Sequence, residues 1–538
     1  MHEDEQVRRW NGWGDESIDF ALNDDMLDFL RARVGDGKPP ADATLAEACR
    51  SVPPGRLAPH RYIDATPEAR LRHAFGQSLP DWLRLRYGRV ESVPDGVAFP
   101  ESSGQVRELL DHARRIDAVV IPYGGGTSVV GHLTVPETGK PVITVNLSRL
   151  STLIDLDPQA QLATFGAGIA GPDLEAQLRA RGYTLGHFPQ SFEYSTLGGW
   201  VVTRSSGQQS LRYGRIEQLF AGGRLETPTG TLAIPAYPAS AAGTDLREIV
   251  LGSEGRMGIL TEATVRITPL PQREAFHAVF FPTWTEAENA VRSIAQAKLP
   301  LSMLRLSNPV ETQTTLAMAG HHRMIGLLQA YLGMRACGEQ KCMLLAGASG
   351  DAATVAHALK QALRIARRYR GVHAGAAIGE KWKQNRFRNV YLRNALWQRG
   401  YAVDTVETAV DWPRVRGMMQ SVEQAARNAL SAFGERVHAY THLSHMYAQG
   451  ASVYTTFAYR LAGRYEEDLE RWKAMKGAAC AAILANGGTI SHQHGVGVDH
   501  APYLQAEKGA LGMGAIRELC RHFDPTGMMN PGKLLPAS

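Results

Sequence analysis

Cysteine is scarce in this sequence: there are five among 538 residues, dispersed and never in a Cys-x-x-Cys pair. Such a set excludes a disulfide-stapled scaffold and a thiolate zinc site, and it is typical of a reducing compartment. Long hydrophobic runs are lacking too, because no stretch approaches the roughly 18 uncharged apolar residues of a membrane-spanning helix. The acidic start of the chain precedes no apolar run. We therefore expect no secretory signal and a cytoplasmic protein, with peripheral membrane contact left open.

An excess of one charge sign is also lacking, since 58 lysines and arginines face 53 acidic residues and the net charge is +5. So small an excess on so long a chain predicts no nucleic-acid partner. The hydrophobic fraction of 44% and the charged fraction of 21% are ordinary for a globular protein and exclude a disordered or fibrous chain. At about 100–200 residues per domain, the length predicts two to four packed units. The sequence leaves open whether the protein forms a homodimer.

The pattern of apolar and polar residues changes along the chain and divides it into four parts. Residues 1–90 form a mixed helical and extended segment, and residues 91–270 alternate short helical and strand patterns. Residues 271–465 hold longer helical patterns between short strands, which predicts a second α+β unit. Residues 466–538 open on a long helical pattern and end in turns, so we predict a C-terminal helical segment that returns to the second part.

Apolar periodicity predicts individual elements inside these parts. A helix over 101–116 places its apolar side chains on one face and can be capped by Ser102 or Ser103. The β-branched run at 118–121 predicts a buried strand directly after that helix. Further strands are predicted over 142–145, 162–165 and 451–457, and further helices over 172–181, 286–297, 353–370, 415–430 and 466–484.

Glycine, by contrast, is abundant, with 54 residues, or about 10% of the chain against roughly 7% on average. Three glycines, Gly124 to Gly126, follow the strand at 118–121 and precede Thr127 and Ser128. Bare backbone and hydroxyl donors in that position suit a phosphate, although a tight glycine turn is the commoner explanation of such a run. Val129 stands where a dinucleotide fingerprint has its third glycine, and the lysine of a P-loop is lacking.

Two later segments have the same character. The first reads Ser-Thr-Leu-Gly-Gly-Trp at 195–200 and is followed by Thr-Arg-Ser-Ser-Gly at 203–207. The second reads Gly-Ser-Glu-Gly-Arg-Met-Gly-Ile at 252–259. Three loops of small and hydroxyl residues in one predicted domain favour an extended dinucleotide over three coincidental turns.

At these segments the sequence resembles the FAD-binding domain of the vanillyl-alcohol-oxidase/PCMH superfamily, and within it the alkyldihydroxyacetonephosphate synthase family. The likeness spans almost the whole chain, from a tryptophan–glycine cluster at 10–14 through the block at 187–200 to the block at 483–497. It implies an α+β fold with a two-subdomain PCMH-type FAD-binding domain and an α+β cap. It also implies non-covalent FAD, so His132 near the glycine loop is expected to be solvated or in the core.

The resemblance further implies which residues contact the FAD, and it assigns no metal. The predicted contacts are Pro122, Tyr123, Gly124, Gly125, Gly126, Thr127, Ser128, Gln190, Ser191, Ser195, Thr196, Gly199, Thr203, Ser205, Ser206, Glu254, Gly255, Gly258 and Ile259.

The reaction implied by the resemblance exchanges the acyl group of acyl-dihydroxyacetone phosphate for a fatty alcohol, as in ether-lipid synthesis. The substrate, a small phosphorylated lipid, would be held on flavin N5 without net redox change. Tyr454, in the predicted strand 451–457, matches the family's proton-transfer tyrosine, although a ring in the core is the plainer interpretation. A phenol with a pKa of about 10 transfers a proton near neutral pH only if a cation or the flavin lowers that pKa.

His492 and His494 lie two residues apart on an extended segment, so both rings face one side, which suits proton transfer or metal binding. The synthase family has three consecutive histidines here, whereas this chain has Gln493 in the middle. In related flavin-dependent 2-hydroxy-acid dehydrogenases, the residue in the place of Gln493 is a metal-binding glutamate. Glutamine is a poor ligand for a divalent metal, so Gln493 weakens the alternative that this chain is such a dehydrogenase. His442 and His445 keep that alternative open.

Arg393 matches the family's substrate-phosphate arginine, and a phosphate suits a planar, permanently charged donor, although most helix arginines are simply exposed. Arg305, His442 and His187 are also expected at the site, the first two as substrate contacts and His187 as a catalytic residue. The C-terminal stretch around Lys533 is more like the hydroxy-acid dehydrogenases. The alternative function is therefore an FAD-dependent dehydrogenase or oxidase of a 2-hydroxy acid or a polyol phosphate. A flavoprotein that only binds is less favoured.

Overall fold

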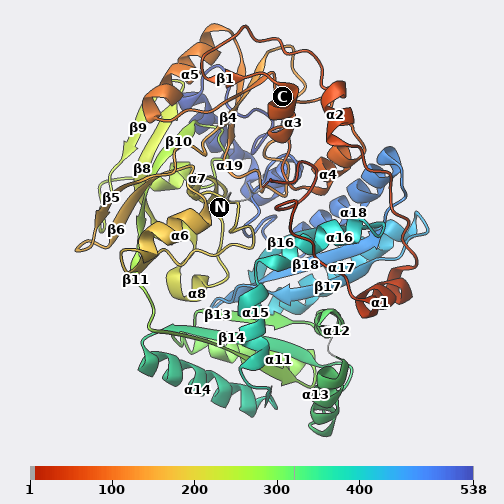
Figure 1. Cartoon of the computed structure of the whole chain (residues 1–538). Coiled ribbons are helices and arrows are strands. Elements are labelled where there is room, and N and C mark those ends of the chain that lie inside the picture. The colour runs from red at the N-terminus through yellow and green to blue at the C-terminus, as the bar shows by residue number, and fades with distance from the viewer. Residues whose placement is uncertain (1–6, 320–321, 537–538) are drawn as a thin grey trace, which may run out of the picture.

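The computed structural model describes residues 7–319 and 322–536, so the acidic residues at the start of the chain lie outside the described part. Figure 1 shows two sheets with their helices in the upper half of the molecule and one large sheet with its helices in the lower half. The predicted α+β class, with two subdomains and a cap, is confirmed. We call the lower half the cap.

The first subdomain is built on a four-stranded sheet in the order β1-β2-β4-β3. Its strands are β1 Ile63–Asp64, β2 Gly96–Ala98, β3 Val119–Tyr123 and β4 Val142–Asn146. Helix α5 (Ser103–Arg115) covers this sheet with its apolar face, as the periodicity predicts. Ser102 caps the helix by accepting a hydrogen bond from the Gln105 amide. Strand β3 carries the glycine loop at its carboxyl end.

The second subdomain is a five-stranded antiparallel sheet in the order β5-β6-β10-β8-β9. Its strands are β5 Leu153–Asp157, β6 Leu162–Gly166, β8 Phe220–Thr227, β9 Gly230–Ile234 and β10 Ile259–Arg266. Helices α6 (Gly171–Arg179) and α7 (Leu197–Thr203) bury leucines and Trp200 in the core of this subdomain. The sheet thus carries two of the three predicted FAD loops, one at the start of α7 and one before β10.

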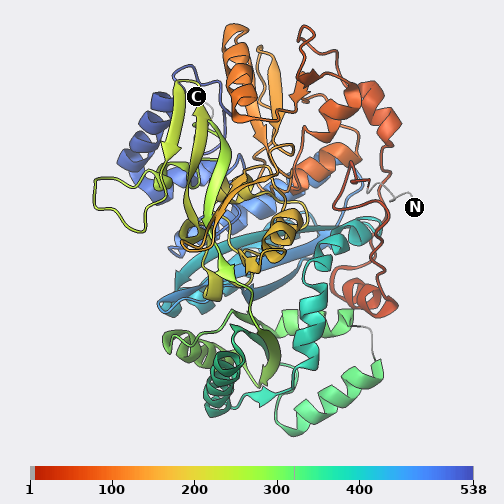
Figure 2. The same ribbon diagram turned by 60° about the vertical axis from the view of Figure 1, so that its left-hand side comes forward.

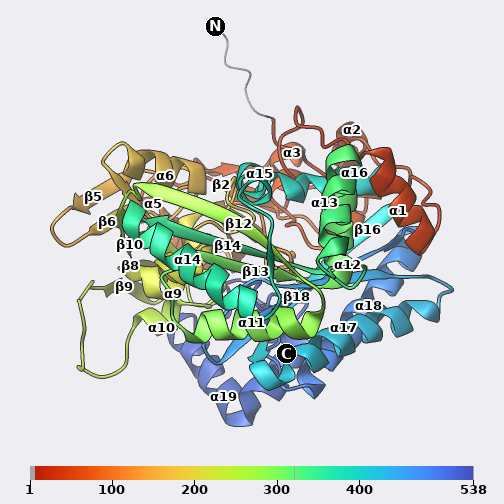
Figure 3. The same cartoon turned by 90° about the horizontal axis from the view of Figure 1, so that it is seen from below.

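The cap is a seven-stranded antiparallel sheet in the order β15-β12-β14-β13-β17-β18-β16. Its strands are β12 Arg273–Phe281, β13 Met303–Ser307, β14 Cys342–Gly350, β15 Val372–His373, β16 Tyr401–Asp411, β17 His438–Leu443 and β18 Gly450–Arg460. The predicted helices of this region are α11 (Trp284–Gln296), α14 (Ala352–Arg368) and α17 (Val415–Ser431). They pack against the sheet, and Figure 3 shows α11 and α14 lying across it.

Both ends of the described chain join the halves of the molecule. Helices α18 (Tyr465–Ala485) and α19 (Ala501–Phe523) lead back to the first subdomain. There the backbone N–H of Asn530 donates a hydrogen bond to the Val120 carbonyl at 2.8 Å. Near the other end, the side chain of Asn394 in the cap bonds both the amide and the carbonyl of Trp13. Figure 2 shows this N-terminal stretch running along one side from the first subdomain down to the cap. The two halves are therefore clamped at their common boundary.

Candidate functional site

The glycine loop is pressed against the segment that begins α7. A Cβ atom on Gly125 would lie 1.7 Å from the Tyr194 carbonyl oxygen, and one on Gly124 would lie 2.4 Å from Thr196 Oγ1. Gly126 has a φ of +63°, which also favours glycine. The bare backbone is therefore required by the close approach of two loops that the sequence predicts to share one ligand.

The third loop packs on the segment that carries the glycine loop, since a Cβ on Gly255 would lie 2.9 Å from Pro122 Cγ. Its Glu254 is buried, and the carboxylate accepts hydrogen bonds from the amides of Val496 and Gly497. The same carboxylate lies 3.1 Å from Nε2 of His132. Glu254 thus ties the C-terminal segment to the loop through its side chain, and the buried His132 belongs to that network, as expected of a core histidine.

Several buried polar atoms, one on the third loop and three on the segments around residue 187 and residues 491–494, have no hydrogen-bond partner among the described residues. They are Ser253 Oγ, His187 Nδ1, Ser491 Oγ and His494 Nδ1. A cavity of about 390 Å³ is lined by Gly124, Gly126 and Thr196, and arginines from the N-terminal region also line it. FAD carries phosphate, ribityl and ring groups that require such donors and acceptors. The residues present therefore fit FAD.

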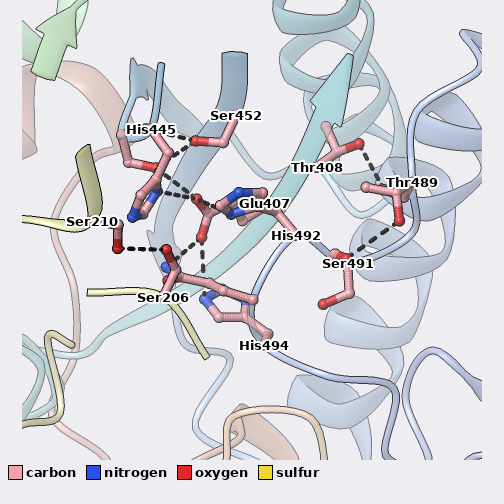
Figure 4. A network of polar contacts seen from close by, with 12 residues as sticks. Ser206, Ser210, Glu407, Thr408, His445, Ser452, Thr489, Ser491, His492 and His494 are labelled. Atoms are coloured by element: carbon pink, nitrogen blue, oxygen red, sulfur yellow. Dashed lines mark hydrogen bonds and ion pairs between the residues drawn. The ribbon is translucent and has the colours of Figure 1, made fainter. Parts of the chain in front are cut away.

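A buried carboxylate in the cap is the centre of a polar cluster. Glu407 on β16 is 1% exposed, and Figure 4 shows His445, His492 and His494 converging on it. Its Oε1 lies 3.2 Å from Nδ1 of His492, and its Oε2 accepts a hydrogen bond from Gln493 at 2.6 Å. Burial works to raise the pKa of Glu407, but the neighbouring histidines hold it well below its usual value. The cluster is therefore built around an anion.

Strand register places Tyr454 next to this cluster. Tyr454 on β18 lies opposite Glu407 on β16 and opposite His442 on β17. Its ring stacks on His442 at 4.7 Å, and the ring of His494 meets it edge-on at 5.7 Å. Burial raises the pKa of Tyr454 to about 12. In this state the phenol is neutral, and a ligand would have to lower its pKa before it could release a proton.

Arg305 and His442 are brought together by a glutamate to which the sequence reasoning gave no role. Glu311 in helix α12 (Pro309–Met318) binds Arg305 at 2.7 Å and Nδ1 of His442 at 3.0 Å. Burial works to raise the pKa of Glu311, but His442 and Arg305 lower it to about 2. The two predicted substrate contacts are thus held by one buried anion beside Tyr454.

Arg393 is half-buried in the short helix α16 (Leu392–Trp397) rather than exposed. Its guanidinium donates to the Gln77 carbonyl at 2.7 Å and lies over the Trp82 ring, 4.3 Å from the ring centroid. Burial lowers its pKa, while Asp404 and Tyr454 are among the groups that oppose the change. Stacking on an aromatic ring orients the guanidinium without using an anionic partner. Its positive charge therefore stays available to bind an anion.

His187 lies at the boundary between the halves, where its Nε2 hydrogen-bonds Ser205 Oγ at 2.7 Å. Burial, with smaller contributions from the charges of Arg215 and His445, lowers the pKa of His187 to about 3. The sequence reasoning missed Arg215, which lies in the same boundary, and assigned no role to Glu407. A glutamate in the apolar strand pattern of β16 is a signal for a buried partner, whereas nothing local distinguishes Arg215 from a surface arginine.

Comparison with known protein families finds two matches along the chain. Residues 94–234 match the FAD binding domain family, and residues 270–534 match the family of FAD linked oxidases, C-terminal domain. The chain is also 32% identical to the alkyldihydroxyacetonephosphate synthase of Dictyostelium discoideum over 475 residues, which cover 87% of this chain and 77% of the relative. The chain belongs to the alkyldihydroxyacetonephosphate synthase family.

Two further comparisons agree with this membership. The alkyldihydroxyacetonephosphate synthase of Trypanosoma brucei brucei is 27% identical, with 98% of this chain and 92% of the relative covered. A solved structure of an alkyldihydroxyacetonephosphate synthase superposes with a TM-score of 0.83 at 26% identity, covering 98% of this chain and 99% of that one. As a family member, the chain is an enzyme whose cofactor is FAD. Non-covalent binding and the individual FAD contacts remain predictions.

Proposed function

We propose that this protein exchanges the acyl group of acyl-dihydroxyacetone phosphate for a fatty alcohol, a step of ether-lipid synthesis. The 32% identity to a synthase over 87% of the chain is the single observation that carries the proposal. The product is an ether and the leaving group is a fatty acid, so the exchange consumes no electron acceptor. An assay without any acceptor therefore tests it directly.

The roles we propose follow from the placement of each side chain. Arg393 binds the substrate phosphate, since its guanidinium is held flat on Trp82. Tyr454 moves the proton at the reacting carbon, and His494, whose ring meets the Tyr454 ring edge-on, receives it. FAD, when bound, supplies an electron sink for the reacting carbon. His187 acts as a further catalytic residue and Arg305 as a substrate contact. His442 orients the Tyr454 ring by stacking on it.

The alternative of a hydroxy-acid or polyol-phosphate dehydrogenase is not favoured. Relatives that are 32% and 27% identical over 87% and 98% of this chain are named synthases, whereas a D-lactate dehydrogenase is 24% identical over 84% of it. Gln493 donates its amide N–H to Glu407, so its side chain supports the carboxylate rather than acting as an anionic metal ligand. A dehydrogenase would bleach the flavin anaerobically with a hydroxy acid and would leave the FAD reduced, which is the outcome that would favour the alternative.

We also propose that the cap touches a membrane through helix α13 (His322–Met334), at the lower end of the molecule in Figure 1. The helix buries Leu332 but exposes Met324, Leu327 and Met334, whose exposed fractions are 68%, 74% and 79%. An exposed apolar helix face suits a lipid surface, where the substrates of this reaction are dissolved. No helix among the described residues is long and apolar enough to span a membrane.

Flotation with phosphatidylcholine vesicles containing anionic lipid tests the membrane contact. Wild type should float, and Leu327→Glu should float several-fold less while keeping its activity on a soluble short-chain substrate. Leu511→Glu on α19 is the matched control, because Leu511 is also exposed, at 90%. Equal flotation of all three proteins would contradict the assignment. Sedimentation velocity tests whether the protein forms a homodimer.

A further inference from the structure

Arg215 crosses from the second subdomain to the C-terminal segment and the cap. It directly precedes the short helix α9 (Ile216–Leu219). Its Nη1 lies 2.7 Å from Nε2 of His492 and 3.2 Å from the Tyr447 hydroxyl, and its Nη2 donates to the His492 carbonyl at 3.0 Å. One guanidinium therefore holds both the backbone and the ring of His492.

The position of Arg215 determines where the proton of the His492 ring lies. A guanidinium is always protonated and only donates, so the Nε2 atom that it faces must offer a lone pair. The Tyr447 hydroxyl, 2.6 Å from the same nitrogen, can donate to it as well. Burial lowers the pKa of His492 to about 4, so the ring is neutral near pH 7. The single proton of a neutral ring must then be on Nδ1.

The opposite edge of the ring agrees with this tautomer. Nδ1 of His492 lies 3.2 Å from Oε1 of Glu407, which is anionic, so a protonated Nδ1 faces a negative charge. Ser444 donates its hydroxyl to the same Oε1 at 2.6 Å, and the His445 ring lies 4.8 Å from the His492 ring. His445 has its Nε2 at 3.1 Å from the Gly207 carbonyl and therefore donates there. Both ring nitrogens of His492 therefore face buried or half-buried protein groups, Glu407 at Nδ1 and Arg215 with Tyr447 at Nε2.

We infer that Arg215 and Glu407 are positioning residues that fix His492 as a neutral Nδ1–H tautomer, so that His492 anchors the site and does not carry the proton. The proton carrier beside Tyr454 is then His494. Its Nε2 is 3.9 Å from Glu407, and its Nδ1 has no hydrogen-bond partner among the described residues. This inference deepens the proposed function and rests on it for the identity of the reaction.

The same geometry bears on metal binding. By residue type, Glu407, His445 and His492 could hold a divalent metal, since their ligand atoms lie within 4.8 Å of one another. A metal on Nδ1 of His492 would require Nε2 to carry the proton and donate it outward. Arg215 cannot accept that hydrogen bond, and its charge opposes a second cation. The guanidinium therefore supplies the positive charge near Glu407 that a metal would supply elsewhere.

Nitrogen-15 NMR of histidine-labelled FAD-loaded protein tests the tautomer without any substrate. The signals of His492 are identified by their loss in His492→Gln. Between about pH 6 and pH 8, we expect a protonated Nδ1 and an unprotonated Nε2, whereas Arg215→Gln should release the ring to a mixture of tautomers. A protonated Nε2 in wild type would overturn the inference. This readout is independent of the exchange reaction, so it distinguishes the inference from the proposed function.

Exchange kinetics give the second test. General acid–base catalysis contributes about 10²–10⁴-fold to rate, so His494→Gln should lose at least about 100-fold in kcat. His492→Gln keeps an amide oxygen that can accept from Arg215, and it should lose less than about tenfold in kcat. FAD absorbance of each purified variant confirms that the site is assembled. Equal losses in kcat for the two variants would overturn the inference.

Discussion

Tyr454 lies directly opposite Glu407 on one neighbouring strand and directly opposite His442 on the other. Side chains paired across antiparallel strands lie on the same face of the sheet, about 4.5–5.5 Å apart at their Cβ atoms. One row across three strands therefore presents an acid, a phenol and an imidazole to the boundary with the FAD-binding subdomains. Most of the chemistry proposed above depends on this row.

The phenol itself gives the first prediction. Tyr454→Phe removes only the hydroxyl, so the stacking on His442 stays and the fold should persist, while kcat for the exchange should fall by at least about 100-fold. Tyr459→Phe is the matched control on the same strand, because the Tyr459 hydroxyl is buried without a partner among the described residues. Comparable activity of the two variants would remove Tyr454 from the proton transfer.

Phosphate recognition gives the second prediction. Arg393→Lys keeps a positive charge but loses the planar fork and much of the stacking on Trp82. We expect KM for the phosphorylated substrate to rise by about 10- to 100-fold, which is the effect of one or two charge-assisted hydrogen bonds. Arg416→Lys, on the exposed side of α17 beside Glu288, is the control. An unchanged KM in Arg393→Lys would show that the phosphate binds elsewhere.

The glycine loop gives the third prediction. Gly125→Ala would place its Cβ 1.7 Å from the Tyr194 carbonyl oxygen, so one of the two loops must move. We expect purified Gly125→Ala to contain several-fold less FAD per chain, measured from the ratio of flavin to protein absorbance. Gly139→Ala meets no atom within 4 Å and should bind FAD as wild type does. Full FAD content in Gly125→Ala would mean that the close approach of the loops does not shape the cofactor site.

The buried Glu311 gives a prediction for acid stability. Its pKa is lowered from 4.5 to about 2 in the folded protein, so it stabilises the fold above the unfolded value and loses that effect as the pH falls from 4.5 towards 2. Glu311→Gln leaves Arg305 and His442 without their anion and should destabilise the protein by about 3–5 kcal/mol near neutral pH. Urea unfolding at a series of pH values measures this. A difference between wild type and variant that stays constant down to pH 2 would contradict the assignment.

Much of the framework could be predicted from the sequence. The helix at 101–116 and the strand at 118–121 are found as α5 and β3, because their local periodicity is strong. The predicted strand at 451–457 lies within β18, which makes Tyr454 a strand residue. The glycine loops could be located because each contains an unusual run of small residues.

The partners of these residues could not be predicted. Tyr454 and Glu407 are 47 positions apart in the sequence. Only the register of β16 against β18 places them opposite each other. Arg215 and His492 are separated by 277 positions, and no local pattern marks an arginine that will be buried at a boundary between two halves. Glu311 is concealed in the first turn of α12, where an acidic residue is expected for the helix alone.

The exchange reaction itself provides the most direct test of the proposed function. Purified FAD-loaded protein is incubated anaerobically with acyl-dihydroxyacetone phosphate and a fatty alcohol, without an electron acceptor, and both products are measured by mass spectrometry. We expect one fatty acid to be released for each alkyl ether formed, over many turnovers, with the FAD oxidised at the end. No ether product, together with stable reduction of the FAD by a hydroxy acid or a polyol phosphate, would contradict the proposed function.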